Sequence, residues 1–515
     1  MIDAERGRLP RRHPTVVHAL VDAARQAPTT PALICGDDTL DYRAYAACVA
    51  GLARELSRWS APGGRIAVLM ANSIDIAIAS FAVQAAGLQL VPLNPAYTAH
   101  ELAPILINAE PAGLIHDADC APAVVELARQ HGIQRRWAVG TGNRLTQWRH
   151  DAVDLSRFPL PSPETLSTLQ YTGGTTGRSK GVNLTHAAVS INVSQREALL
   201  PTRLDDERVL AVTPLFHVYA VAMGLYLAVY CRGTLVILPR YRPEWVFEAI
   251  ARHQITLFSG SPTLFTGLMA HEGFASARLQ SLRLCYSGAS ALPVAVLERW
   301  QQATGCTVVE GYGQSEAGPV LSYNPVNGVR KPGSVGVALP RTDIQIVDLE
   351  SGSSVLPPGT SGEIRARGPQ IMQGYRGLPE ETASALRDGW LYTGDIGEFD
   401  EDGYLFIRDR KKDMVIVGGF NVYPREVEEA LLTHPEVQEA SVVGIPDSYR
   451  GEALVAYVVA RSPALNTDAL LEHLAARLTR YKLPAHVRQL EALPKTAVGK
   501  PDKPALRKLA LELSS

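Results

Sequence analysis

Residues 65–92 have the sequence RIAVLMANSIDIAIASFAVQAAGLQLVP, and this stretch decides the fold class. An apolar run at 65–70 precedes a helical pattern at 74–87, and a second apolar run follows at 88–92. A strand, a helix and a strand in this order predict a parallel sheet with helices on its faces. The rhythm recurs over most of the first 400 residues, with further apolar runs at 208–213, 233–238 and 281–286.

The pattern changes near residue 330, where glycine and proline become dense. The alternation at 343–347 predicts antiparallel strands, and a charged run at 408–413 then interrupts the apolar pattern. The rest indicates a small α+β module, with helices at 424–432 and 468–478 and strands at 440–444 and 453–459. We place the boundary at Lys412, which gives a large domain at 1–411 and a small one at 412–515.

The composition narrows the function classes. A chain of 515 residues exceeds what one hydrophobic core holds, so at least two domains are expected. Lys plus Arg number 50 and Asp plus Glu 52, a formal charge of -2. This balance gives no global electrostatic signature of a nucleic-acid or membrane-binding protein. We therefore expect small-molecule partners and no nucleic acid.

The sequence gives only weak indications of a transmembrane segment, a signal peptide or a metal-binding cysteine cluster. Residues 209–231 contain no charged residue and are long enough to span a bilayer, but Pro214 should interrupt a helix there. A buried core segment is the better interpretation. The first twenty residues lack the apolar region of a signal peptide, so a cytoplasmic protein is expected. The six cysteines form no Cys-x-x-Cys pair and no zinc-type cluster, which favours reduced thiols.

The segment LQYTGGTTGRSKGV at 169–182 is the most informative locally. Four glycines, four hydroxyl residues and Lys180 fall between Thr172 and Gly181. Glycines let backbone N–H groups converge on phosphate oxygens, and the lysine adds positive charge. The Gly-Lys-Ser/Thr ending of a Walker A loop is absent. Composition alone leaves a flexible surface loop as an equal alternative.

Six segments occur in an order that resembles a known family. They are a nucleotide loop at 171–181, an acyl-site segment at 214–219, an adenine and metal segment at 310–318, a ribose segment at 392–395, a hinge at 409–414 and a lysine loop at 494–500. Together they resemble the acyl- and aryl-CoA synthetases of the adenylate-forming superfamily, which include plant coumarate-CoA ligases and bacterial fatty acid-CoA ligases. The resemblance covers nearly the whole chain.

The resemblance implies a fold and a nucleotide site. The expected fold is a multidomain α/β and α+β architecture: a large domain of two stacked α/β sheets with a distorted β-barrel, and a small mobile lid. The ATP- and AMP-binding residues that it implies are Thr172, Gly173, Gly174, Thr175, Thr176, Gly177, Lys180, Gly288, Ala289, Glu310, Gly311, Tyr312, Ser315, Asp395 and Arg410.

The remaining roles are implied in the same way. Lys500 and His217 are the catalytic candidates, although a hydrogen-bonded core histidine is the alternative for His217. The other implied residues are Tyr219 and Gly313, which with His217 form the acyl site, Glu316 and Thr172 for the metal, Lys412 for the hinge, and Gly418, Gly419 and Phe420 for CoA.

Three of these residues also have a physical argument. Asp395 lies between Gly394 and Gly397, so we expect its carboxylate on a tight turn, where it can accept from a ribose diol. Glu316 offers a carboxylate of the kind that a partly hydrated Mg²⁺ prefers. Lys500 could hold a carboxylate and an α-phosphate together and offset the charge between them. Pro501 biases the backbone of Lys500 toward extended conformations.

The function that follows is an ATP-dependent carboxylic acid–CoA ligase, which forms an acyl-adenylate and releases AMP and pyrophosphate. ATP, Mg²⁺ and CoA are the expected cofactors and co-substrates. An adenylating enzyme that loads a separate acyl carrier protein is the alternative, and a non-catalytic nucleotide-binding protein is a third. The acid (fatty, aryl or alicyclic) stays open, because 216–219 and 316–320 resemble coumarate ligases whereas 409–414 and 419–424 resemble fatty acid ligases. A dimeric assembly is also left open.

Overall fold

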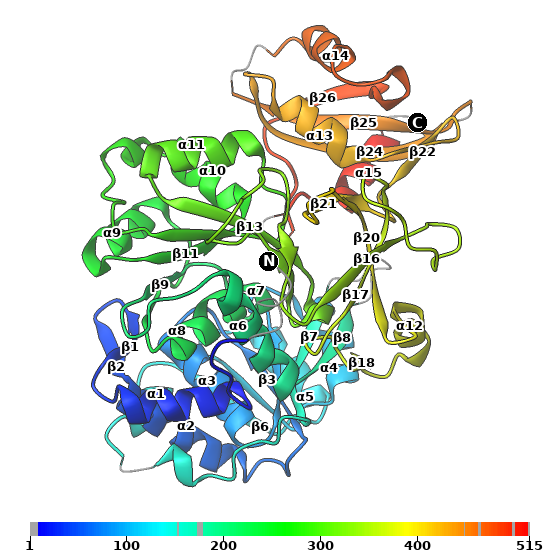
Figure 1. Cartoon of the computed structure of the whole chain (residues 1–515). Coiled ribbons are helices and arrows are strands. Elements are labelled where there is room, and N and C mark those ends of the chain that lie inside the picture. Colours follow the sequence, from blue (N-terminus) through cyan, green and yellow to red (C-terminus); the bar gives the residue numbers. More distant parts are fainter. Residues whose placement is uncertain are drawn as a thin grey trace.

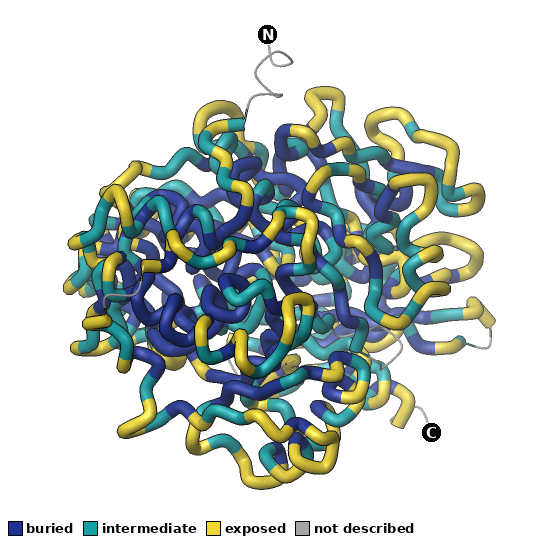
Figure 2. Tube along the Cα trace, turned by 90° about the horizontal axis from the view of Figure 1, so that it is seen from below, coloured by how far each residue is buried: buried dark blue, intermediate teal, exposed yellow. Residues whose placement is uncertain are grey.

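Two large sheets form the body of the protein, and a small domain lies against their end (Figure 1). The computed structural model describes residues 9–151, 154–172, 179–447, 449–461, 465–496 and 500–512. Buried segments run through the middle of the large domain, and exposed segments are mostly loops at its surface (Figure 2).

The first sheet has nine strands, in the order β15-β14-β13-β12-β11-β9-β10-β1-β2. Its central strands from β13 to β1 are parallel, whereas β2, β14 and β15 pair antiparallel at the two edges. The strands are β1 (Pro31–Cys35), β2 (Asp38–Asp41), β9 (Arg208–Ala211), β10 (Thr234–Ile237), β11 (Leu257–Gly260), β12 (Leu284–Ser287), β13 (Thr307–Gly313), β14 (Val320–Tyr323) and β15 (Val337–Ala338).

The second sheet has seven strands, in the order β18-β8-β7-β4-β3-β5-β6. The predicted unit at 65–92 is confirmed as β3 (Arg65–Leu69), α3 (Ile74–Ala85) and β4 (Gln89–Leu93). The other strands are β5 (Gly113–Asp117), β6 (Arg135–Val139), β7 (Leu166–Thr172), β8 (Lys180–Thr185) and β18 (Gly374–Tyr375). The Ser73 side chain begins α3 by accepting a hydrogen bond of 3.2 Å from the Ile76 N–H.

Helices cover both faces of each large sheet, which explains why the strands are apolar on both sides. In β9, Val209 packs into a core shared by the two sheets with α1 (Val16–Gln26), α2 (Tyr42–Leu56), α3 and α6 (His186–Leu199). The next residue, Leu210, packs on the opposite face with α9 (Pro243–His253), α10 (Pro262–Ala270) and α11 (Val294–Thr304). The outer face of the second sheet is covered by α4 (Ala99–Ala109) and α5 (Pro122–Gln130).

The uncharged segment 209–231 is a core segment, as predicted. After β9 it continues through Pro214 into α7 (Val218–Ala220), a π-helix (Val221–Tyr226) and α8 (Leu227–Tyr230). Nearly all of its residues from 219 onward are buried. In the described part of the chain, no helix is both long and apolar enough to cross a membrane.

A third, five-stranded antiparallel sheet occupies the place where the resemblance implies a β-barrel. It contains β16 (Asp343–Val347), β17 (Gly362–Arg367), β19 (Leu386–Arg387), β20 (Trp390–Phe399) and β21 (Leu405–Arg410), with α12 (Pro379–Ala385) between β18 and β19. The strand predicted at 343–347 is therefore present, and the expected fold class is confirmed.

The small domain, called the lid from here on, follows β21. It has a five-stranded sheet of β22 (Val415–Val417), β23 (Phe420–Val422), β24 (Val437–Asp447), β25 (Gly451–Ala460) and β26 (His486–Leu490). Separate apolar clusters pack against it, one with α13 (Pro424–Leu432) and α14 (Thr467–Ala475) and the other with α15 (Lys503–Glu512). Helix α14 ends at Ala475, three residues before its predicted end. Lys412, the expected hinge, lies in the short connection between β21 and β22.

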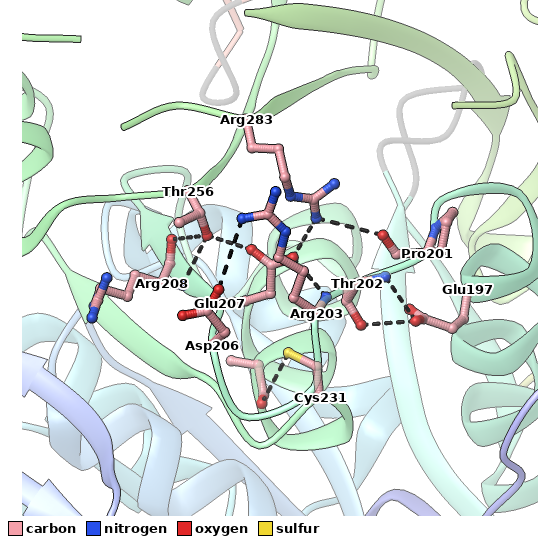
Figure 3. Close-up of polar contacts among 11 residues, drawn as sticks. Glu197, Pro201, Thr202, Arg203, Asp206, Glu207, Arg208, Cys231, Thr256 and Arg283 are labelled. Atoms are coloured by element: carbon pink, nitrogen blue, oxygen red, sulfur yellow. Dashed lines mark hydrogen bonds and ion pairs between the residues drawn. The ribbon is translucent and has the colours of Figure 1, made fainter. Parts of the chain in front are cut away.

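A buried polar cluster joins the amino ends of three parallel strands of the first sheet (Figure 3). Glu207, Thr256 and Arg283 immediately precede β9, β11 and β12, and the Glu207 side chain is fully buried. Its carboxylate accepts hydrogen bonds from the Arg203 N–H at 2.8 Å, from the Thr256 hydroxyl and from the Arg283 guanidinium. Because ligands of such sheets bind at the carboxyl ends of the strands, this cluster serves stability.

The six cysteines are free thiols; Cys35 and Cys120 are half-buried and the others are buried. Cys285 and Cys306, on neighbouring strands, bring their Sγ atoms to 3.5 Å.

Candidate active site

The candidate site lies at the carboxyl ends of the parallel strands, where the body meets the lid. The segments that the sequence singled out follow β7, β9 and β12 and the end of β13, and Asp395 and Lys500 are added from β20 and the lid. Carboxyl ends of neighbouring parallel strands converge on one edge of a sheet, which is where α/β proteins bind nucleotides.

The nucleotide loop connects two antiparallel strands. β7 ends at Thr172, β8 begins at Lys180, and these two residues lie opposite each other in the pair. The residues Gly173, Gly174, Thr175, Thr176 and Gly177, to which phosphate contacts were assigned, lie outside the described residues. Thr172 and Lys180 therefore mark the two ends of the loop.

Tyr375 joins the end of this hairpin to the expected metal residue. It lies in β18, which pairs with β8, and its hydroxyl donates a hydrogen bond of 2.9 Å to Oε1 of Glu316. The Nζ atom of Lys180 lies 5.0 Å from the centre of the Tyr375 ring. Burial raises the pKa of Glu316, against the hydrogen bond from Tyr375 and the charge of Lys180. Sequence reasoning missed Tyr375, because no local pattern distinguishes it.

Asp395 lies within strand β20 and not on a tight turn, which corrects the expectation from its flanking glycines. Gly394 adopts a left-handed φ of 72°, and the pairing with β21 shifts register between Ile396 and Gly397, so the glycines serve an irregular strand. The carboxylate accepts a hydrogen bond of 2.6 Å from the Tyr312 hydroxyl, and Arg410 lies opposite it with Nε 3.7 Å from Oδ1. Burial raises the pKa of Asp395, and the Arg410 charge opposes this.

Lys500 reaches this group from the lid. Burial and the charge of Arg410 lower the pKa of Lys500 to about 8, whereas Asp395 acts to raise it. Burial, and then the charge of Lys500, lowers the pKa of His217 to about 4, so its imidazole is neutral at pH 7. The Nδ1 atom of His217 accepts from the Tyr219 N–H at 3.3 Å and begins α7. Lys500 therefore interacts electrostatically with Asp395, Arg410 and His217.

The loop after β12 is held by Glu310. Oε1 of Glu310 accepts a hydrogen bond of 2.8 Å from the Leu292 N–H, and burial raises the pKa of this carboxyl to about 7. Within the loop, Ala289 has a left-handed φ of 69°. A Cβ atom at Gly288 would lie 2.8 Å from the Tyr219 ring, so only glycine fits there. The side chain of Glu310 thus positions Gly288 and Ala289.

Two glycines on β13 allow neighbouring groups, the Tyr323 ring and the Pro319 backbone, to pack closely against this strand. A Cβ atom at Gly311 would lie 2.5 Å from the Tyr323 ring, and one at Gly313 would lie 1.9 Å from the Pro319 carbonyl oxygen. After β13, Ser315 begins the short 3₁₀ turn Ser315–Ala317, which places Glu316. The expected acyl-site residues Tyr219 and Gly313 therefore belong to one closely packed wall.

A small apolar cavity lies next to the segment that is expected to form the acyl site. This cavity of about 20 Å³ lies between α6, the π-helix and the second sheet. Its lining includes Val189, Val218, Val221, Ala222, Tyr226 and Pro319. Tyr219 lies outside this lining, and its hydroxyl is 3.3 Å from that of Tyr323.

Two family models account for most of the chain. The model described as AMP-binding enzyme matches residues 20–376, and the model described as AMP-binding enzyme C-terminal domain matches residues 426–500. The chain belongs to the AMP-binding enzyme family. The expected superfamily is therefore confirmed, and so is the reaction class, an AMP-forming acid–thiol ligase.

Individual relatives of this AMP-binding enzyme cover almost its whole length. It is 36% identical to the long-chain-fatty-acid–CoA ligase of Bacillus subtilis (strain 168) over 526 residues, covering 96% of this chain and 94% of the relative. It is 37% identical to the feruloyl-CoA synthase of Amycolatopsis sp over 485 residues, covering 93% and 96%. The crystal structure of ATP-bound MatB from Rhodopseudomonas palustris superimposes with a TM-score of 0.90 at 30% identity, covering 98% and 100%.

Polar contacts hold the lid of the AMP-binding enzyme against its body. Oδ2 of Asp409, on β21, accepts from the Arg425 N–H of α13 at 3.0 Å. Arg507, on α15, lies 2.6 Å from Asp413 in the connection between the two parts. Sequence reasoning did not find these contacts, because they join residues far apart in the chain.

The residues expected to contact CoA do not join the Lys500 group in this structure. Gly418 and Gly419, with φ values of 58° and 86°, form the turn between β22 and β23. Phe420 is 56% exposed, and its ring stacks on Tyr481 of the lid with 4.6 Å between ring centres. This lid position thus presents Lys500 to the body and leaves Phe420 on the surface of the AMP-binding enzyme.

Proposed function

We propose that this AMP-binding enzyme joins a carboxylic acid to CoA in two half-reactions that share one site. The observation that carries the proposal is the meeting of Lys500 from the lid with Asp395 and His217 from the body. A cation supplied by a separate domain fits a reaction in which the same site must serve two steps in turn.

In the first half-reaction, a carboxylate oxygen of the acid attacks the α-phosphorus of ATP, and the bond to pyrophosphate breaks. The products are the acyl-adenylate and pyrophosphate. With a pKa of about 8, Lys500 is mostly protonated at pH 7, so it can hold the carboxylate and the α-phosphate together and offset their charge. The Asp395 carboxylate, oriented by Tyr312, accepts hydrogen bonds from the ribose hydroxyls.

The residues near Glu316 suit a magnesium ion that is held mainly by the triphosphate. No group of three or more His, Cys, Asp or Glu side chains in the described ranges could cage a metal. Mg²⁺ at nucleotide sites is bound by one or two carboxylates with phosphates and water, so Glu316 and the Thr172 hydroxyl would hold it. When bound, it neutralises phosphate charge.

In the second half-reaction, the thiol of CoA attacks the acyl carbon and AMP leaves with the bonding electron pair. Lys500 has no part in this step, so the lid is free to turn about Lys412. Rotation would bring Gly418, Gly419 and Phe420 to the site, where glycines let the pantetheine chain pass close to the backbone. A separate acyl carrier protein as thiol donor is the alternative.

The comparisons support two acid classes. The Bacillus subtilis relative is a long-chain-fatty-acid–CoA ligase, and the Amycolatopsis relative is a feruloyl-CoA synthase. Both names give CoA as the thiol, which favours CoA over a carrier protein. We therefore propose fatty or aryl acids as the substrate class.

The test is pyrophosphate release from ATP and Mg²⁺ across fatty, aryl and alicyclic acids, followed by mass spectrometry of the product formed with CoA. We expect acid-dependent pyrophosphate release and an acyl-CoA thioester. Pyrophosphate release that yields no thioester with CoA, but does yield one with a carrier protein, would favour the alternative. No acid-dependent release with any acid would contradict the proposal.

A further inference from the structure

Arg196 is a buried cation without a carboxylate partner. It lies on α6, is 1% exposed, and forms no ion pair within 4.0 Å in the described part of the chain. Its Nε donates to the Asn192 carbonyl at 3.2 Å, Nη1 contacts the Met223 sulfur at 2.7 Å, and Nη2 has no partner. The adjacent Glu197 is instead held by Thr202 at 2.8 Å. Since thioether sulfur is a weak acceptor, this guanidinium keeps unused donors.

Three buried tyrosines lie near this guanidinium. Burial lowers the pKa of Arg196, and the nearby Tyr323, Tyr286, Glu197 and Tyr219 act to raise it. The hydroxyls of Tyr219 and Tyr323 lie 3.3 Å apart, and the buried hydroxyl of Tyr286 has no hydrogen-bond partner. Among the fourteen buried side-chain polar atoms without a hydrogen-bond partner in the described residues, Nη2 of Arg196 and the hydroxyl of Tyr286 belong to this cluster.

The cluster shares two helices with the lining of the apolar cavity. Met223, which contacts Arg196, belongs to the π-helix whose residues Val221 and Ala222 line the apolar cavity, and Val189 of α6 lines it too. Tyr219 packs over Gly288 at the front of the same wall. His217, whose pKa the charge of Lys500 helps to lower, immediately precedes this helical segment.

We propose that Arg196 determines specificity by forming, with the hydroxyls of Tyr219, Tyr286 and Tyr323, a polar end to the acyl pocket that takes an acid bearing a second oxygen acceptor. This inference rests on the proposed function and narrows its substrate class. The acceptor is a carboxylate at the far end of an aliphatic acid or a hydroxyl on an aryl acid. A pocket with buried donors discriminates strongly against an analogue that leaves those donors unpaired.

The first test compares matched acids with the wild-type enzyme by kcat/KM for pyrophosphate release. One pair is octanoate and suberate, and the other is cinnamate and 4-hydroxycinnamate. We expect kcat/KM to be at least about tenfold higher for the acceptor-bearing acid in one pair or both. The pair that shows this difference identifies the source of the acceptor. If kcat/KM for the member without the acceptor is equal or higher in both pairs, the inference is wrong while the proposed function stands. No release with any acid would overturn both.

The second test asks whether Arg196 causes the preference. Arg196→Met keeps an unbranched side chain and removes the charge, so kcat/KM for the preferred acid should fall about tenfold to hundredfold, while its hydrocarbon partner reacts at least as well as before. Arg196→Lys should restore part of the preference. Arg203→Met removes an exposed arginine that follows the C-terminal end of α6, and it should leave kcat/KM unchanged for both acids. An equal loss for both acids would show a purely structural role and overturn the inference. If Arg196→Met fails to fold, the wild-type pairs decide alone.

Discussion

The hydroxyl of Tyr312 donates a hydrogen bond of 2.6 Å to Oδ2 of Asp395. Oδ1 of the same carboxylate faces Arg410 across the strand pair at 3.7 Å. One oxygen is thus fixed by a short neutral donor, and the other lies beside a positive charge without a close hydrogen bond to it. The carboxylate is oriented while acceptor positions remain for a diol.

Asp395→Ala should weaken ATP binding through the loss of these acceptors. Each charge-assisted hydrogen bond contributes about 1.5–3 kcal/mol, so KM for ATP should rise at least about tenfold. Tyr312→Phe serves as the matched variant, because it removes only the orienting bond and should have the smaller effect. Steady-state kinetics at saturating acid measures both. An unchanged KM in Asp395→Ala would remove this residue from the ribose site.

Glu316→Ala should raise the Mg²⁺ concentration needed for adenylation. The variant loses the carboxylate that would share the ion with the triphosphate, whereas Tyr375→Phe keeps the carboxylate and loses only its 2.9 Å hydrogen bond. A Mg²⁺ titration of pyrophosphate release at fixed ATP should therefore shift clearly for Glu316→Ala and weakly for Tyr375→Phe. Full activity with the wild-type Mg²⁺ dependence would contradict the assignment.

Lys500→Ala should slow acyl-adenylate formation by about 10²–10³, the usual scale for one preorganised electrostatic contact. Given synthetic acyl-adenylate and CoA, it should form the thioester at nearly the wild-type rate. Rapid quench of each half-reaction measures the two rates.

Lys412→Pro is the converse variant, because it stiffens the expected hinge and should slow only the thioester step. Lys508→Ala, on a side chain that is 80% exposed, controls for the loss of basic charge. The account of a lid that alternates between two steps fails if Lys500→Ala slows both halves equally or if the control matches it.

The first half-reaction should lose rate as the pH rises through about 8. Burial holds the pKa of Lys500 near that value, below its ordinary value of 10.5, so the ammonium form dominates at pH 7 and the neutral amine at about pH 9. Because kcat/KM reports groups of the free enzyme, kcat/KM for ATP in adenylation should show this limb, and Lys500→Ala should lack it. A wild-type profile that stays flat past pH 9 would show that the charge of Lys500 is dispensable.

Glu207→Ala should destabilise the large domain without entering the site. It leaves the guanidinium of Arg283 and the hydroxyl of Thr256 without their buried partner, which costs about 3–5 kcal/mol. The thermal midpoint should fall by several degrees, while KM values of the folded enzyme stay unchanged. Asp206→Ala removes an exposed pair with Arg203, 3.8 Å long, and should change stability little. Equal midpoints for the two variants would contradict this role.

Local patterns in the sequence predicted the parts of the fold that depend on local periodicity. The strand–helix–strand unit at 65–92 was found within a few residues, because both sheet faces are buried and the helix has a side-chain cap. Asp395 was misplaced, because glycines on both sides indicate a turn whereas pairing of β20 with β17 and β21 makes an irregular strand. Tyr375 and Arg196 could not be found, because only the folded chain gives them their neighbours.

The π-helix Val221–Tyr226 determines how a deletion mutation would change this part of the protein. A π turn holds about one residue more than an α turn, so deleting one codon here would return the segment to α geometry, shift the side chains within the turn and leave the residues after it in phase. Met223 would leave Arg196, and the residues facing the cavity would change together. A point substitution alters one side chain of this wall, whereas a single-codon deletion replaces several at once and leaves the nucleotide-binding segments untouched.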